Sequence, residues 1–140
     1  MRKDARKVAF SLIYEYLFTR QKDDLLLEQF TKKEDADDTI FEIDDMDKQY
    51  VSNLYDSVIK KFDYYQQKVA QLADGFKSER LFKVDLAILM MAFCELDAKE
   101  TPLPIVINEA VNLAKIYSTE NSAGFINGIL AEYSKTQQTD

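Results

Sequence analysis

Hydrophobic residues recur at steps of three and four along most of the chain, which is the spacing of amphipathic helices. Residues 2–18 carry such a stripe, made of Ala5, Val8, Ala9, Leu12, Ile13 and Tyr16. The helical spacing also runs through residues 46–76, which is long for one uncapped helix of a globular domain. We therefore expect two consecutive helices there, with a break at residues 63–67 and an end at Gly75.

The second half of the chain predicts three further helices. Residues 84–93 are apolar on almost every side, which is typical of a helix surrounded by others. Pro102 and Pro104 then mark a new helix start, because proline is tolerated in the first turn. A last helix follows residues 118–122, and residues 135–140 are expected to form a disordered tail. The pattern as a whole predicts about seven helices and no strand, in one domain spanning residues 1–134.

Composition supports this fold class and narrows the setting. Three glycines and two prolines are too few for the frequent turns of a sandwich or barrel, whereas 46% apolar residues suffice for a core. No uncharged apolar run is long enough to span a membrane. The single Cys94 forms no internal disulfide, and we expect it to be a small buried hydrophobe. Because no basic and then apolar leader precedes the first predicted helix, a cytoplasmic protein is expected.

The absence of histidine argues against catalysis. It removes the usual general base, the commonest zinc ligand and the middle member of a hydrolase triad. Neither GxGxxG nor GxxxxGK[ST] occurs, so the two common phosphate cradles of nucleotide enzymes are missing. The sequence therefore predicts a protein that is not an enzyme and has no metal or cofactor.

Residues 20–48 are strongly acidic, and one part of them resembles a calcium loop. Asp35 and Asp37 are spaced like the first ligands of an EF-hand. However, Ile40 stands where that loop needs glycine, and Met46 stands where it needs a bidentate glutamate. A solvated polar connection is the favoured interpretation, preceded by a short helix.

The first predicted helix has an unusual polar face. Four cations and two aromatics share neighbouring rows of it: Arg2, Lys3, Arg6, Lys7, Phe10 and Tyr14. A solvated basic end explains this face as well as a binding surface does, so both interpretations stay open.

Gly124 and Gly128 lie four residues apart on the last predicted helix, where each costs about 1 kcal/mol relative to alanine. Two explanations compete. Either another helix crosses so closely that a Cβ would clash, which is the commoner cause, or the glycines leave room for a ligand at the helix start.

The sequence PLPIVINEAVNLAKIYSTENSAGFINGIL, residues 102–130, resembles the C-terminal signature of the NusB family of transcription antitermination factors. Its elements here are Pro104, Val106, Asn108, Glu109, Ala110, Leu113 to Lys115, Ser122, Phe125, Asn127, Gly128 and Leu130. VDLAILMMAFCEL is similar to the central helix of the family, and ARKVAFSLIY is similar to the helix that carries its arginine-rich motif.

The resemblance implies two packed helical bundles that bind single-stranded boxA RNA of ribosomal RNA leader transcripts. The implied partner is a small-subunit ribosomal protein, called NusE in this role, within an antitermination complex on RNA polymerase. The cations would contact phosphates, and Phe10 or Tyr14 would stack on an unpaired base. Further RNA contacts are expected at the start of the last helix, where free N–H groups favour phosphate. These residues are Asn121, Ser122, Gly124 and Phe125. Phe125 could stack on a base or belong to the core, and the core is the favoured interpretation.

Three features depart from this picture or qualify it. The net charge is −7, so local charge must decide RNA binding. Leu86 and Met90 stand where the family commonly has arginines, and Asn121 stands where it often has an acid. Asp85 matches an acid near the partner surface of the family, so the resemblance assigns it to the ribosomal protein. An exposed helix charge is the alternative for Asp85.

Two broader alternatives remain. The chain is also consistent with an acidic interaction module that docks a basic ribosomal partner without specific RNA binding. Whether the free protein forms a homodimer that hides the basic helix is open as well.

Overall fold

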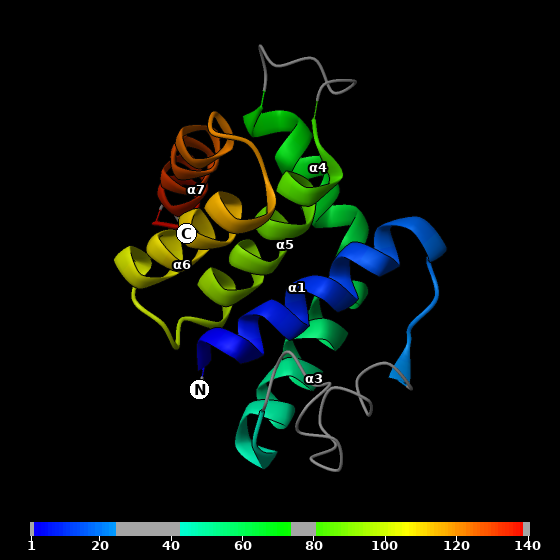
Figure 1. The fold of residues 1–140 in the computed structure, drawn as a ribbon. Helices are drawn as coiled ribbons and strands as arrows, with labels where there is room; N and C mark the ends of the chain where they lie inside the picture. Colours follow the sequence, from blue (N-terminus) through cyan, green and yellow to red (C-terminus); the bar gives the residue numbers. More distant parts are fainter. Residues whose placement is uncertain (1, 25–42, 74–80, 139–140) are drawn as a thin grey trace. The chain divides into compact units, whose positions relative to one another are not determined.

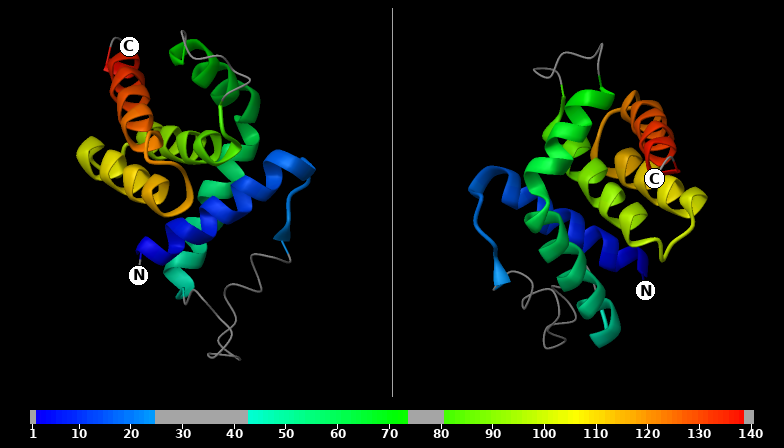
Figure 2. Two further views of the ribbon diagram at one scale, coloured as in Figure 1. Left: turned by 45° about the horizontal axis from the view of Figure 1, so that its top comes forward. Right: turned by 180° about the vertical axis from the view of Figure 1, so that it is seen from behind.

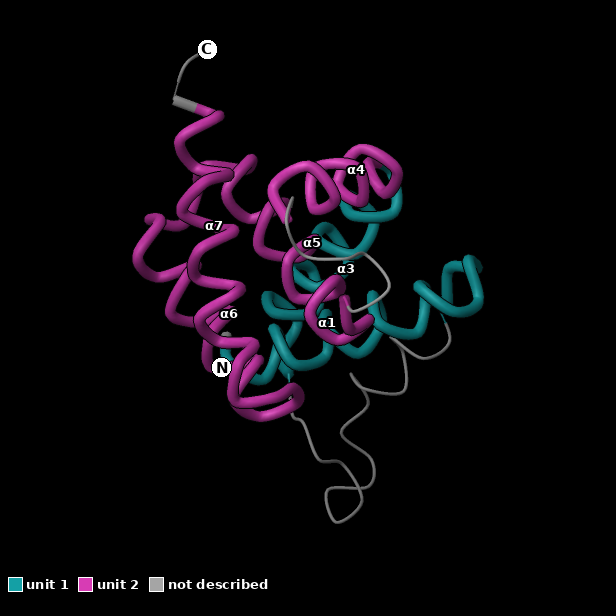
Figure 3. The backbone as a smooth tube through the Cα atoms, turned by 90° about the horizontal axis from the view of Figure 1, so that it is seen from above, with its two compact units in different colours: residues 1–60 teal, residues 61–140 magenta. Residues whose placement is uncertain are grey.

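The computed structural model describes residues 2–24, 43–73 and 81–138. Within these residues the chain forms helices and no strand, which confirms the all-α prediction (Figure 1). The six described helices are α1 (Arg2–Thr19), α3 (Asp45–Lys60), α4 (Phe62–Leu72), α5 (Lys83–Ala98), α6 (Leu103–Tyr117) and α7 (Ser122–Gln138). The chain divides into two compact units, residues 1–60 and residues 61–140 (Figure 3).

The helical stretch between residues 46 and 73 is interrupted once, as predicted, but at a different place. The break expected at residues 63–67 is wrong, because α3 and α4 separate at Lys61. Lys61 has φ −108° and ψ 23°, outside the helical range, and is the one residue between the two helices. Since Val58, Phe62, Tyr65 and Val69 keep helical spacing across it, the hydrophobic pattern carries no sign of the break. The expected end at Gly75 lies outside the described residues.

In the first unit, α1 and α3 pack against each other. Their buried residues include Ala5, Val8, Ala9, Leu12 and Ile13 of α1 and Val51, Leu54, Tyr55 and Val58 of α3. The helix α3 begins after Asp44, whose Oδ1 accepts a hydrogen bond of 2.8 Å from the backbone N–H of Asp47. This cap satisfies one of the free N–H groups of the first turn and explains why α3 starts there.

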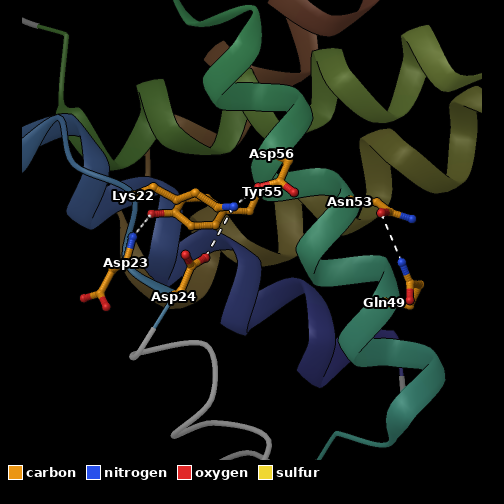
Figure 4. Close-up of polar contacts among 7 residues, drawn as sticks. All are labelled: Lys22, Asp23, Asp24, Gln49, Asn53, Tyr55 and Asp56. Carbon is orange, nitrogen blue, oxygen red and sulfur yellow. Dashed lines mark hydrogen bonds and ion pairs between the residues drawn. The ribbon is translucent and has the colours of Figure 1, made fainter.

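Polar contacts hold the segment after α1 against α3 (Figure 4). The backbone N–H of Asp23 donates to the Tyr55 hydroxyl at 2.9 Å. The Lys22 Nζ lies 2.7 Å from Asp56 and 3.3 Å from Asp24. Because Tyr55 and Asp56 belong to α3, these contacts fix the direction in which the chain leaves α1.

Glu15 of α1 lies beside Asp23 of this segment. Its carboxyl is half-buried, and partial burial raises its pKa above the ordinary value of 4.5. A hydrogen bond with the Asp23 carboxyl and repulsion by its charge raise the pKa of Glu15 further. The folded protein therefore holds a proton on Glu15 at pH values where the unfolded chain has released it.

This raised pKa predicts a pH-dependent gain from Glu15→Gln. Folded-state protonation makes the free energy of unfolding fall as pH rises from about 4.5 through the raised pKa. A glutamine can still donate to Asp23 but has no proton to lose. The stability of the variant relative to the wild type should thus increase as pH rises above about 4.5, measured by urea unfolding. The exposed Glu100→Gln controls for the loss of one charge, and an equal gain in both variants would contradict the assignment.

The second unit is built around α5. Every residue from Ala87 to Leu96 is buried, including Cys94, and α5 packs against α4, α6 and α7. Figures 1 and 2 show α5 between α4 and α6, with α6 and α7 side by side. The prediction of a central helix surrounded by others is confirmed within this unit.

A buried polar cluster joins α4, α5 and α7 at the end of α5. The Tyr65 hydroxyl donates to Asp97 Oδ2 at 2.7 Å, and the Tyr133 hydroxyl donates to Asp97 Oδ1 at 2.8 Å. The Tyr133 ring stacks on Phe93 with centroids 3.9 Å apart. Burial first, and then the bond to Asp97, raise the pKa of both tyrosines well above the ordinary value. Both hydroxyls therefore stay protonated and serve as donors.

The same carboxylate explains why α7 is longer than expected. The helix ends at Gln138, whereas the sequence predicts a disordered tail from residue 135. The Gln137 amide donates to Asp97, and the Thr136 hydroxyl donates to the carbonyl of Tyr133 at 2.7 Å. These bonds give the last turn partners that a polar sequence alone does not reveal.

Candidate nucleic-acid interface

The cations of α1 differ in their exposure. Lys3 is exposed and Lys7 is half-buried. Arg6 is only 6% exposed, and its guanidinium carbon lies 5.9 Å from the centroid of the Tyr50 ring on α3. Arg2 opens the helix, and its side chain lies outside the part that the structure describes. Lys3 and Lys7 are therefore the described cations of this group that can best reach a phosphate, whereas Arg6 is held within the unit by α3.

Aromatic rings continue the basic face along α1. Phe10 stacks on Tyr14 with centroids 5.8 Å apart, and Tyr14 meets Phe18 edge-on at 5.1 Å. Phe10 is 4% exposed, Tyr14 is half-buried, and Phe18 is 57% exposed. The row of three rings, Phe10, Tyr14 and Phe18, thus runs from the interior to the surface. Tyr14 and Phe18 present the ring area that a base could stack on. Sequence reasoning missed Phe18, although its spacing of four residues from Tyr14 is the signal that could have found it.

The start of α7 is exposed at two of the predicted positions. Asn121 and Gly124 are exposed, and Phe125 is half-buried. A Cβ added at Gly124 or at Gly128 would have no atom within 4 Å. The explanation that another helix crosses closely at these glycines is therefore wrong. The other explanation, that the glycines leave room for a ligand, is consistent with this open space.

Ser122 and Asp85 turn toward each other inside the second unit. Asp85 is 3% exposed and Ser122 is 2% exposed. The Ser122 hydroxyl donates to Asp85 Oδ2 at 2.8 Å, and the Ser118 hydroxyl donates to Asp85 Oδ1 at 2.6 Å. An exposed helix charge, the alternative for Asp85, is therefore wrong. The carboxylate also lies beside the start of α7, where it complements the helix dipole and leaves less attraction for a phosphate.

The two positions where the family commonly has arginines also differ in burial. Met90 is fully buried within the apolar part of α5, and Leu86 is half-buried. Neither side chain offers a charge to RNA. Among the described helices, α1 holds four cations, more than any other.

The described residues contain no group of three or more Cys, Asp or Glu side chains placed to hold a metal ion. The calcium-like run of residues 35–46 lies mostly outside the described part of the chain. Among the described helices, none is both long and apolar enough to cross a membrane.

Comparison with known proteins gives one consistent answer. The model of the NusB family matches residues 3–135. The transcription antitermination protein NusB of Acetivibrio thermocellus is 32% identical, over 97% of this chain and 90% of the relative. The protein of the same name from Finegoldia magna is 34% identical, over 98% of this chain and 96% of the relative.

Solved structures agree with the sequence matches. The structure of T. maritima NusB superposes with a TM-score of 0.77 at 26% identity, covering 96% of this chain and 91% of that one. A structure of the antitermination factors NusB and NusE in complex with dsRNA shares the fold, with a TM-score of 0.75 at 23% identity, covering 96% of each chain. With a family match over nearly its whole length and relatives above 30% identity, the chain belongs to the NusB family.

Proposed function

We propose that the protein is a transcription antitermination factor that binds boxA-type RNA of ribosomal RNA leader transcripts. It acts together with a small-subunit ribosomal protein, NusE, and helps RNA polymerase to transcribe processively. The observation that carries the proposal is the face of α1, where Lys3 and Lys7 continue into the Tyr14 and Phe18 rings. Single-stranded RNA is bound by cations that contact phosphates and by aromatic rings that stack on bases. The proposed function involves no catalysis.

Charge distribution supports this assignment despite the net charge of −7. Residues 25–42 hold six acids and two lysines, whereas α1 holds four cations and two acids. The excess negative charge therefore lies largely in a different segment from the proposed RNA surface. Exposed charges more than about 10 Å from a phosphate are screened at 0.1 M salt, so the charges of α1 itself weigh most in the phosphate contacts that α1 makes.

The proposed partner rests on the family relationship. The relative solved with NusE and dsRNA combines both ligands in one complex. We propose that this chain likewise forms a heterodimer with its ribosomal protein and joins the polymerase complex through it. Asp85 stays a prediction as a partner residue, and its burial favours an indirect contribution.

A second function is favoured by one observation, the burial of Arg6 and Phe10. If the remaining cations of α1 are too few for RNA, the acidic chain would serve as an interaction module that docks the basic ribosomal protein alone. This candidate predicts tight partner binding and no preference among RNA sequences.

Fluorescence anisotropy distinguishes the two functions. A labelled boxA RNA and a scrambled control are titrated with the protein, with and without the ribosomal partner, at about 50 and 200 mM salt. Preference for boxA that sharpens with the partner and weakens with salt is expected. Partner binding without any RNA preference would overturn the RNA proposal and establish the second function.

The open space at the two glycines gives a paired prediction. Gly124→Ala and Gly128→Ala are each expected to raise the free energy of unfolding by about 0.5–1 kcal/mol, because alanine is the better helix former. No clash opposes either change. Gly124→Ala should in addition weaken boxA binding, since Gly124 lies in the first turn of α7 and Gly128 lies one turn later. Urea unfolding and anisotropy check both effects, and equal RNA affinity in the two variants would exclude a ligand role for Gly124.

A further inference from the structure

The Asp85 carboxylate accepts hydrogen bonds from both ends of the connection between α6 and α7. Ser118 is the residue that caps the end of α6, and Ser122 is the first residue of α7. Both donate their hydroxyl protons to Asp85, one to each oxygen. The Thr119 hydroxyl lies 3.0 Å from the Ser122 oxygen and has its own proton to donate there. The Ser118 and Ser122 hydroxyl oxygens also lie 2.8 Å apart, so the three hydroxyls and the carboxylate form one connected hydrogen-bond network.

The hydrogen bonds to Asp85 set the rotation of the first turn of α7 about the helix axis. Ser122 is turned inward, and a helix places the residue two positions later on nearly the opposite side. Gly124 accordingly lies on the exposed side, and Asn121 is exposed as well. The backbone N–H of Ser122 also donates to the carbonyl of Thr119 at 3.1 Å, so the connection is closed by both side-chain and backbone bonds.

We propose that Asp85 is a positioning residue for the RNA-facing start of α7. Its carboxylate holds the connection of residues 118–122 in one arrangement before RNA arrives, so that binding does not have to order it. This inference rests on the proposed function and adds a residue to it that touches no RNA itself.

Positioning and electrostatics make opposite predictions for Asp85. An amide in place of the carboxylate removes a negative charge near the RNA surface, which by itself would strengthen binding. The amide also has a single acceptor oxygen, so one of the two serine hydroxyls loses its partner. If positioning dominates, Asp85→Asn binds RNA more weakly, although the protein has become less acidic.

The experiment compares Asp85→Asn, Ser118→Ala and Ser118→Thr with the wild type, using anisotropy of labelled boxA RNA and hydrogen exchange of the amides of residues 121–125. Ser118→Ala is expected to lose about tenfold in affinity and to exchange faster, because the turn is no longer held by this bond and becomes ordered only on binding. Ser118→Thr keeps the hydroxyl, and its extended backbone at φ −122° and ψ −157° accepts threonine, so it should retain wild-type behaviour.

Tyr133→Phe serves as the matched control. It removes one hydroxyl bond to a carboxylate at the opposite end of α7, with a comparable loss of stability, and should leave RNA affinity unchanged. Equal affinity losses in Tyr133→Phe and Ser118→Ala would mean that only stability matters and would overturn the inference. Tighter binding by Asp85→Asn, or unchanged binding by Ser118→Ala, would overturn it as well. A wild-type protein without boxA preference would instead overturn the proposed function, and this inference with it.

Discussion

Replacing Asp97 by alanine is expected to lower the free energy of unfolding by about 3 kcal/mol. The Tyr65 and Tyr133 hydroxyls both donate to this carboxylate, and both residues are 1% exposed. Without Asp97 both buried residues lose this acceptor for their hydroxyls, at a cost of about 1–3 kcal/mol apiece. For a domain of this size the midpoint of thermal unfolding should fall by about 10 °C.

A second substitution shows whether the lost acceptor is the cause. In the wild type, Tyr133→Phe should cost about 1 kcal/mol, because it removes one hydrogen bond. In the Asp97→Ala background the same change should cost nothing or restore stability, since it deletes an unsatisfied hydroxyl. The exposed Asp63→Ala on α4 controls for the loss of an acid. Additive effects of the two substitutions at Asp97 and Tyr133 would contradict this account.

Reversing the charge of Lys3 and Lys7 together should weaken boxA binding by about two orders of magnitude at 0.1 M salt. Each substitution by glutamate removes a counterion-releasing contact and adds a repulsive one. The slope of log affinity against log salt should also fall by about 1.4, which is roughly 0.7 for each lost phosphate contact on a single strand. Anisotropy titrations over a salt series measure both quantities.

The choice of variant follows from burial. Arg6 is covered by Tyr50, so its reversal would leave an unpaired buried charge and confuse binding with folding. Lys60→Glu with Lys115→Glu is the matched control, because both lysines are exposed and the net charge changes equally. If the control pair weakens binding as much as the α1 pair, net charge alone governs the affinity and α1 is not the RNA surface.

The helices were largely predictable from the sequence because their hydrophobic residues recur at helical spacing, on almost every side of α5 and in one stripe on the others. The break at Lys61 was not, since a single residue left the helix without proline, glycine or a change in the phase of the stripe. The last turn of α7 was likewise hidden, because its partner, Asp97, lies 40 residues away from Gln137. Local pattern reasoning finds helices through their own periodicity and misses ends that are fixed by distant side chains.

The candidate site was predictable in part for the same reason. Lys3, Lys7 and Tyr14 could be placed on one helical face by spacing alone. The burial of Arg6 depends on Tyr50, a residue of another helix, and a single sequence gives no indication of that contact. The bonds from Ser118 and Ser122 to Asp85 span 33 and 37 residues, so a buried polar network was read as a surface charge or a ligand contact.

The two carboxylates of α5 have a mechanical consequence. Asp85 and Asp97 are separated by about 18 Å along α5, and their partners Ser122 and Tyr133 by about 16 Å along α7, given 1.5 Å per residue. The two helices therefore run in the same direction and are joined by hydrogen bonds at two points. A slide of α7 by one turn, about 5.4 Å, would break the bonds at both points. Axial sliding of α7 therefore costs the bonds to both carboxylates, whereas bending or fraying at one end costs fewer.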